Sequence, residues 1–69
     1  PSRRSSDLNK IIMASFYEQN SLFIDAINAY EEAIIIAPGV KAYKMTYKNF
    51  LERVGLEQFF KYELGENKK

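Results

Sequence analysis

The strongest constraint on the fold is a single break, Pro38 followed by Gly39, near the middle of a 69-residue chain. Proline lacks the backbone donor that a helix interior needs, and glycine leaves helical geometry easily, so this pair ends the element before it. Pro38 is the only proline after Pro1, and Gly55 and Gly65 are the next breaks. So few breaks favour a small number of long elements over many short strands.

Between these breaks, apolar residues recur at helical spacing, and no segment alternates with the period of two that a half-buried strand requires. We therefore predict an all-α protein that forms one helical domain over residues 1–69. It consists of an antiparallel helical hairpin, a third helix and a short capping helix. The predicted helices span residues 6–19, 22–37, 40–54 and 56–64. A polar tail over residues 65–69 is expected to be flexible.

Composition argues against several classes of protein. With no Cys and no His, the chain lacks disulfides, the usual zinc ligands and the side chains most used for nucleophilic and acid–base catalysis. Its three glycines stand too far apart for a phosphate-binding loop. We expect no enzyme activity, no bound metal and no cofactor.

Charge and hydropathy bear on partners and location. Ten Lys and Arg against nine Asp and Glu leave a net charge of +1, too low to indicate a nucleic-acid-binding protein. The longest apolar run, residues 33–37, is far too short to span a membrane. Because small secreted domains usually depend on disulfides, a chain without Cys is expected to be intracellular, cytoplasmic or nuclear.

Small and bulky residues follow one another at regular intervals over the first two predicted helices. The positions are Lys10, Met13, Ala14, Tyr17, Ala26, Tyr30, Ala33 and Pro38. This register resembles one full tetratricopeptide repeat, a helix–turn–helix motif of 34 residues, over residues 6–38. A partial second repeat and a capping helix follow over residues 40–64. The residues expected to cap the exposed apolar edge are Leu56, Phe59, Phe60 and Leu64. Lys10 stands where the family most often has Trp, and Ala14 replaces Gly. The small Ala14 and Ala26 on facing helices should let the two backbones approach closely.

A second family and a generic three-helix bundle remain alternatives. Domains that interact with microtubules and trafficking components are three-helix bundles of about this length. Their second helix resembles the stretch from Phe23 to Ile34, with Ala26, Tyr30 and Ala33 between them. The Pro-Gly break after the second helix and a glycine inside the third depart from that pattern.

The resemblance to tetratricopeptide repeats implies a non-enzymatic module that binds a peptide or helix of another protein. A self-assembly unit that forms a homodimer is the alternative. The predicted binding residues are Leu8, Ile11, Ser15, Glu18 and Gln19 in the first helix, Ile35 in the second and Lys41, Lys44 and Lys48 in the third. The plainer interpretation of the three lysines is that they form exposed ion pairs with the acidic second helix.

Three apolar residues exceed what a two-helix unit can bury: Ile12, Phe16 and Ile35. The repeat pattern also buries Ile36. We expect the three residues to be buried within the chain, against Phe59 and Phe60 of the last helix, and an exposed patch that pairs two chains is the alternative.

A basic stretch precedes the first predicted helix. Arg3, Arg4, Ser5 and Ser6 resemble the site of a basophilic kinase, which makes Ser6 a candidate for phosphorylation. A phosphate there would sit at a helix N-terminus, where the helix dipole favours negative charge.

Overall fold

The computed structural model describes residues 6–63 of the chain, and over these residues it contains three α-helices, one turn of 3-10 helix and no strand. The helices are α1 (Ser6–Gln19), α2 (Phe23–Ile36), α3 (Lys41–Val54) and the 3-10 turn η2 (Glu57–Phe59). The all-helical fold predicted from the periodicity is confirmed, and each α-helix ends within one residue of its predicted bounds. The predicted tail, residues 65–69, lies outside the described residues.

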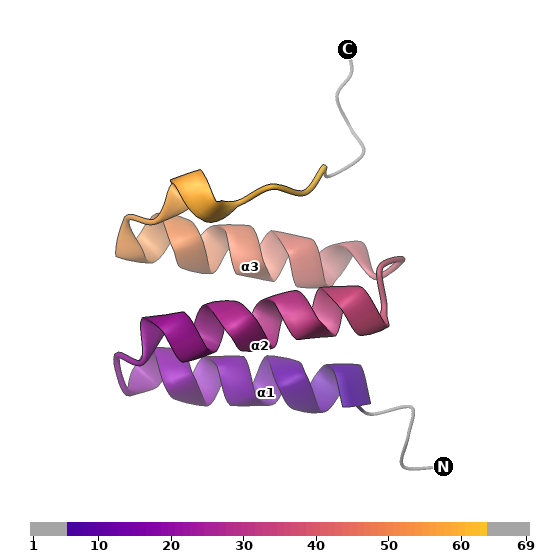
Figure 1. The fold of residues 1–69 in the computed structure, drawn as a ribbon, viewed down its shortest axis with the longest axis horizontal. Helices are drawn as coiled ribbons and strands as arrows, with labels where there is room; N and C mark the ends of the chain where they lie inside the picture. Colours follow the sequence, from indigo (N-terminus) through magenta and orange to yellow (C-terminus); the bar gives the residue numbers. More distant parts are fainter. Residues whose placement is uncertain (1–5, 64–69) are drawn as a thin grey trace.

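The three α-helices lie side by side in chain order, with α2 between α1 and α3 and each helix antiparallel to the next (Figure 1). The structure measures 39 × 29 × 12 Å along its principal axes, so it is a flat layer. One consequence is that α1 and α3 each have an edge that no other α-helix covers.

Helix spacing within the layer follows side-chain size. α1 packs more closely on α2 than α3 does. Ala14 of α1 and Ala26 and Ala33 of α2 are fully buried, and such small side chains allow two backbones to approach closely. Between α2 and α3 the rings of Tyr30 and Tyr47 stack with centroids 5.5 Å apart, which holds these two helices further apart.

The predicted breaks lie where the helices end. Pro38 and Gly39 form the turn between α2 and α3. Gly55 ends α3 in the left-handed conformation (φ 76°), and the Leu56 amide donates to the carbonyl of Leu51 at 2.8 Å. This backward hydrogen bond is the usual helix-ending motif that favours glycine.

The segment after α3 differs from the prediction, because its described residues, 56–63, do not form an α-helix. After the single turn η2, Phe60 adopts an extended conformation (φ −75°, ψ 123°). Phe60 and Tyr62 both contact the buried ring of Tyr47, with centroids 5.9 and 6.1 Å away. Side chains two residues apart share one side of an extended chain but not of a helix. Tertiary contact with Tyr47 therefore overrides the helical spacing.

The capping role predicted for this segment is met by a partly different set of residues. Leu56 and Phe60 pack against the core as expected, and Tyr62 joins them. Phe59 instead keeps 46% of its surface exposed. Leu64, the fourth predicted capping residue, lies outside the described residues.

Candidate functional site

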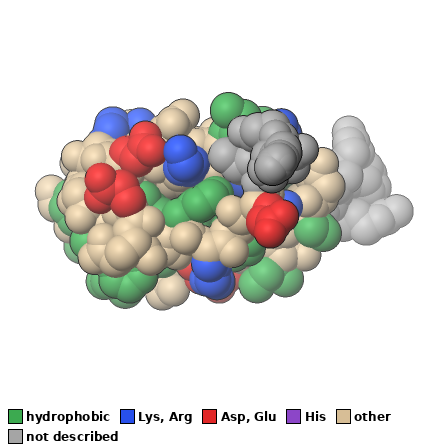
Figure 2. Space-filling view, turned by 90° about the horizontal axis from the view of Figure 1, so that it is seen from above, with side chains coloured by type: hydrophobic (Ala, Val, Ile, Leu, Met, Phe, Trp, Pro, Cys, Tyr) green, Lys and Arg blue, Asp and Glu red, His purple; other side chains and the backbone are tan. Residues whose placement is uncertain are grey.

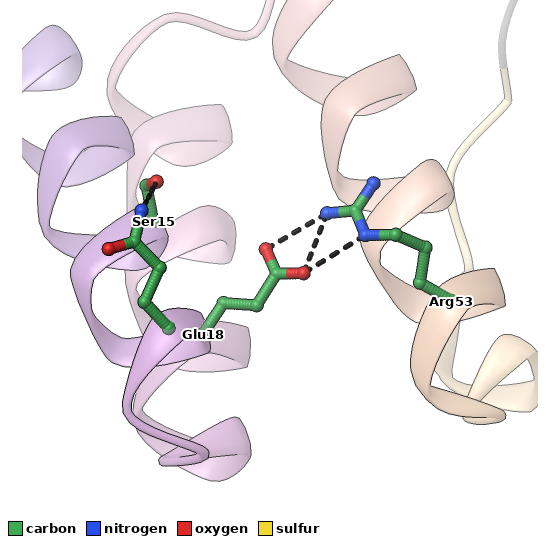
Figure 3. Close-up of polar contacts among 4 residues, drawn as sticks. Ser15, Glu18 and Arg53 are labelled. Atoms are coloured by element: carbon green, nitrogen blue, oxygen red, sulfur yellow. Dashed lines mark hydrogen bonds and ion pairs between the residues drawn. The ribbon is translucent and has the colours of Figure 1, made fainter.

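Glu18, one of the predicted binding residues, connects α1 to α3 (Figure 3). The Arg53 Nε donates to Oε2 of Glu18 at 3.0 Å, and Nη2 donates to Oε1 at 2.9 Å and to Oε2 at 2.8 Å. Such paired contacts fix the guanidinium against the carboxylate. Beside this pair, Gln19 Nε2 donates to the hydroxyl of Ser15 at 3.5 Å. Glu18 is thus engaged within the fold, while Ser15 and Gln19 are exposed.

The other two charged residues of α1 also contact neighbouring helices. Asp7 accepts a hydrogen bond from the hydroxyl of Tyr43 on α3 at 2.8 Å, and this bond raises the pKa of Tyr43. Lys10 pairs with Glu32 on α2 at 2.8 Å, and the hydrogen bond to that carboxylate raises the pKa of Lys10. All the charges of α1 are therefore directed toward α2 or α3.

The face of α1 opposite the buried Ala14 carries no charge. Leu8, Ile12 and Phe16 stand one helical turn apart on this face, with exposed fractions of 49%, 59% and 59%. We call these three residues the α1 ridge. An apolar stripe at this spacing normally faces a core, so the α1 ridge is an uncovered apolar surface. Ile11, another predicted binding residue, is instead half-buried against the core.

The predicted burial of the surplus apolar residues is wrong. Ile12 and Phe16 belong to the exposed α1 ridge, Ile35 keeps 72% of its surface exposed and Ile36 keeps 48%. The physical reason is that the segment after α3 covers the Tyr47 side of the layer and does not form the helix that was expected to reach them. Of the two outcomes considered for Ile35, exposure is the one observed.

The lysines of α3 are partly engaged within the chain. Lys48 donates to Glu52 of the same helix at 3.1 Å, and Lys44 Nζ lies 6.0 Å from the ring centroid of Tyr62. Lys41 is exposed at the start of α3. Seen from the α3 and η2 side, the visible described surface shows basic and acidic side chains interspersed, not one continuous basic patch (Figure 2).

The acidic residues of α2 pair mainly with residues outside α3. The sequence had instead suggested the lysines of α3 as their partners. Glu32 pairs with Lys10, as described above, and Glu31 Oε2 accepts the Lys61 Nζ at 2.8 Å. The same oxygen accepts the Tyr47 hydroxyl at 2.7 Å. Sequence reasoning missed this cluster, because Glu31 and Lys61 are far apart in the chain and neither belongs to a local motif.

The pKa values of this cluster follow its contacts. Burial alone would raise the pKa of Glu31, but the hydrogen bonds from Lys61 and Tyr47 outweigh it, so its pKa lies below the ordinary value. Burial, together with the bond to Glu31, raises the pKa of the Tyr47 hydroxyl. The bond to Glu31 also raises the pKa of Lys61. Near neutral pH the tyrosine and lysine are therefore both donors to an ionised carboxylate.

A shallow pocket lies between α1 and α2. Its volume is about 130 Å³, and its lining residues are Lys10, Met13, Tyr17, Asp25, Asn28, Ala29 and Glu32. Pockets that bury drug-sized ligands are roughly 300–1,000 Å³. The polar lining and small volume are suited to a few water molecules.

No protein-family model, curated protein or solved structure matches this chain. Within residues 6–63, no helix has the length and apolar character needed to cross a membrane. Over the same residues, no three acidic side chains come together as metal ligands would. Ser6, the candidate phosphorylation site, is the exposed first residue of α1, and the preceding Arg3, Arg4 and Ser5 lie outside the described residues.

Proposed function

We propose that the chain is a non-enzymatic protein-interaction module whose α1 ridge binds an amphipathic helix of a partner protein. One observation carries this proposal: every charge of α1 is directed toward the fold, whereas Leu8, Ile12 and Phe16 are exposed on its uncharged face. Covering that face would remove apolar surface from water without desolvating a charge, which would otherwise oppose binding.

The spacing of the α1 ridge supports a helix as the partner. Leu8 and Phe16 are eight residues apart, which is about 12 Å along a helix axis. Residues four apart form the ridges that fit into grooves of a second helix. A partner helix with its own apolar stripe would match this surface in length and character.

The resemblance to a tetratricopeptide repeat over residues 6–38 also supports a binding module. Ala14, Ala26 and Ala33, which occupy the small-residue positions of the repeat, are fully buried. Pro38 follows α2, as a helix-ending proline of the repeat would.

A homodimer is the second candidate, and the symmetry of the α1 ridge favours it. Leu8 and Phe16 each lie four residues from Ile12. Two α1 helices that pair antiparallel about a two-fold axis at Ile12 would place the leucine of one copy against the phenylalanine of the other. A two-fold interface requires such self-complementarity.

Photo-crosslinking tests both candidates. The purified full chain carries p-benzoylphenylalanine in place of Phe16 or, as a matched control, in place of the exposed Ile35. After irradiation in cell extract, mass spectrometry identifies the adducts. We expect position 16, and not position 35, to crosslink to a second protein, and Ile12→Lys in the same chain to abolish that adduct.

Two other results would change the assignment. Adducts between two copies of the chain through position 16 would support the homodimer and contradict the partner helix. Adducts from position 35 alone would overturn both candidates, because the binding surface would then lie on α2. Circular dichroism of each variant would verify that the helices are retained.

A further inference from the structure

Residues 60–62 lie on α2 and α3 in the manner of a bound peptide, and we call them the docked tripeptide. Figure 1 shows this segment running back along α3 after η2. Phe60 is extended, and the rings of Phe60 and Tyr62 both contact Tyr47. The two rings also meet edge to face, with centroids 5.8 Å apart. Both aromatic side chains of the tripeptide thus lie on a single aromatic platform.

Lys61, the middle residue of the docked tripeptide, is held by electrostatic contacts. Lys61 Nζ donates to Glu31 at 2.8 Å and lies 5.3 Å from the ring centroid of Tyr62. Lys44 of α3 approaches the same ring at 6.0 Å. Cations within about 6 Å of a ring centroid are attracted by its negative face. The contacts therefore select an aromatic residue, a basic residue and a second aromatic residue in succession.

The receiving surface consists of Glu31, Lys44 and Tyr47, which lie on two packed helices. With the docked tripeptide in place, Tyr47 has 0% of its surface exposed. Its hydroxyl and Lys61 share one carboxylate oxygen of Glu31. This surface therefore combines an apolar platform with one negative charge that is complementary to a basic residue.

We propose that the surface of Glu31, Lys44 and Tyr47 is a peptide-binding site that accepts, from a partner protein, an extended aromatic–basic–aromatic segment in exchange for the docked tripeptide. The site is separate from the α1 ridge and does not depend on its role. Residues 60–62 act as an internal competitor. The affinity for the incoming peptide is reduced in proportion to the fraction of chains in which the site is open.

Fluorescence anisotropy with a labelled peptide of residues 57–63 tests this proposal. The peptide is titrated with the full chain, with Lys61→Ala and with the double variant Phe60→Ser/Tyr62→Ser. Loss of the exposed Lys61–Glu31 pair should tighten peptide binding by about two- to fivefold. Loss of both rings should tighten it by at least about tenfold, because the internal competitor no longer fills the site.

Charge exchange provides the specificity control. A peptide with Glu in place of its lysine should bind the unmodified chain at least about tenfold more weakly. Glu31→Lys should reverse that preference. Ile12→Lys, on the α1 ridge, should leave peptide binding unchanged, so that failure here and failure of the helix-binding role can be distinguished.

Two outcomes would overturn the proposal. The first is that the peptide binds the unmodified chain and Lys61→Ala with the same affinity, or binds neither of them at a millimolar peptide concentration. The second is that the peptide with lysine and the peptide with Glu in its place bind with the same affinity. Should the double variant prove unfolded by circular dichroism, Lys61→Ala still decides the matter, because it changes an exposed side chain.

Discussion

A few polar side chains connect elements that are distant in the chain. Glu31 joins α2 to Tyr47 of α3 and to Lys61 beyond η2, and Glu18 joins α1 to Arg53 of α3. Each of these carboxylates accepts more than one hydrogen bond. Removing one of them would leave several donors without a partner, which costs more than the loss of a single surface ion pair.

The pH dependence of stability should reveal the role of Glu31. Its pKa in the folded chain lies below the ordinary value of 4.5. Ionised Glu31 therefore stabilises the fold above pH 4.5, and this contribution is lost as the pH falls through the folded-state pKa. The difference in free energy of unfolding between the unmodified chain and Glu31→Gln should therefore shrink as the pH falls from 4.5 through the folded-state pKa of Glu31.

Urea denaturation at a series of pH values from neutral to acidic measures this difference. Glu57→Gln, at an exposed position on η2, is the matched control. A difference for Glu31→Gln that stays constant across the series would show that its hydrogen bonds do not favour the ionised carboxylate.

Between helices, side-chain size decides the distance. Alanines at the contact of α1 and α2 allow close packing, whereas the aromatic rings of Tyr30, Tyr47 and Phe50 fill the space between α2 and α3. Tyr30 and Phe50 have centroids 5.2 Å apart. A change of volume should therefore be tolerated least at the alanines, where no flexible side chain is present to yield.

Ala26→Leu should force α1 and α2 apart. Ala26 has 0% of its surface exposed, and overpacking at such a site destabilises by about 1–3 kcal/mol. In a domain of this size, 1 kcal/mol lowers the melting temperature by about 4–8 °C. Thermal melts followed by circular dichroism measure the effect, with the exposed Ala42→Leu on α3 as the control. An unchanged midpoint for Ala26→Leu would contradict close packing of the two helices.

As a whole, the described part of the molecule is a flat layer with two edges, and the two differ in whether another segment covers them. The segment after α3 covers the Tyr47 edge with Leu56, Phe60 and Tyr62. Within residues 6–63 no segment covers the α1 edge in this way, and the α1 ridge is exposed. A chain of this size has a thin margin of stability, so the cover on the Tyr47 edge is expected to contribute to folding.

Deletion of residues 56–69 should unfold the chain or cause aggregation. It exposes the side of Tyr47 that is now buried and removes Leu56, Phe60 and Tyr62, which pack against the core. Truncation of one large core side chain costs about 2–5 kcal/mol, a large share of the 5–15 kcal/mol typical of whole domains. Circular dichroism and light scattering measure the outcome, and deletion of residues 64–69 alone is the control. A monomeric shortened chain with an unchanged melting midpoint would contradict the capping role.

The sequence by itself determined the helices, because the relevant signals are local. Apolar spacing located α1, α2 and α3, and Pro38 and Gly55 marked the ends of α2 and α3. The small residues at Ala14 and Ala26 were identified as contact positions, and both are fully buried. The exposure of the predicted binding residues Leu8, Ser15 and Gln19 also agrees with their helical positions.

Only the tertiary structure decided which side chains meet across long stretches of chain. The pairing of Glu18 with Arg53 and of Glu31 with Lys61 joins residues 35 and 30 positions apart, and no local pattern encodes either. The extended conformation of Phe60 depends likewise on the ring of Tyr47. Ile35 is exposed because the segment after α3 packs on Tyr47 and does not cover it. A helical period reports which face of a helix is apolar, but the element that covers that face is chosen by competition among all the surfaces of the folded chain.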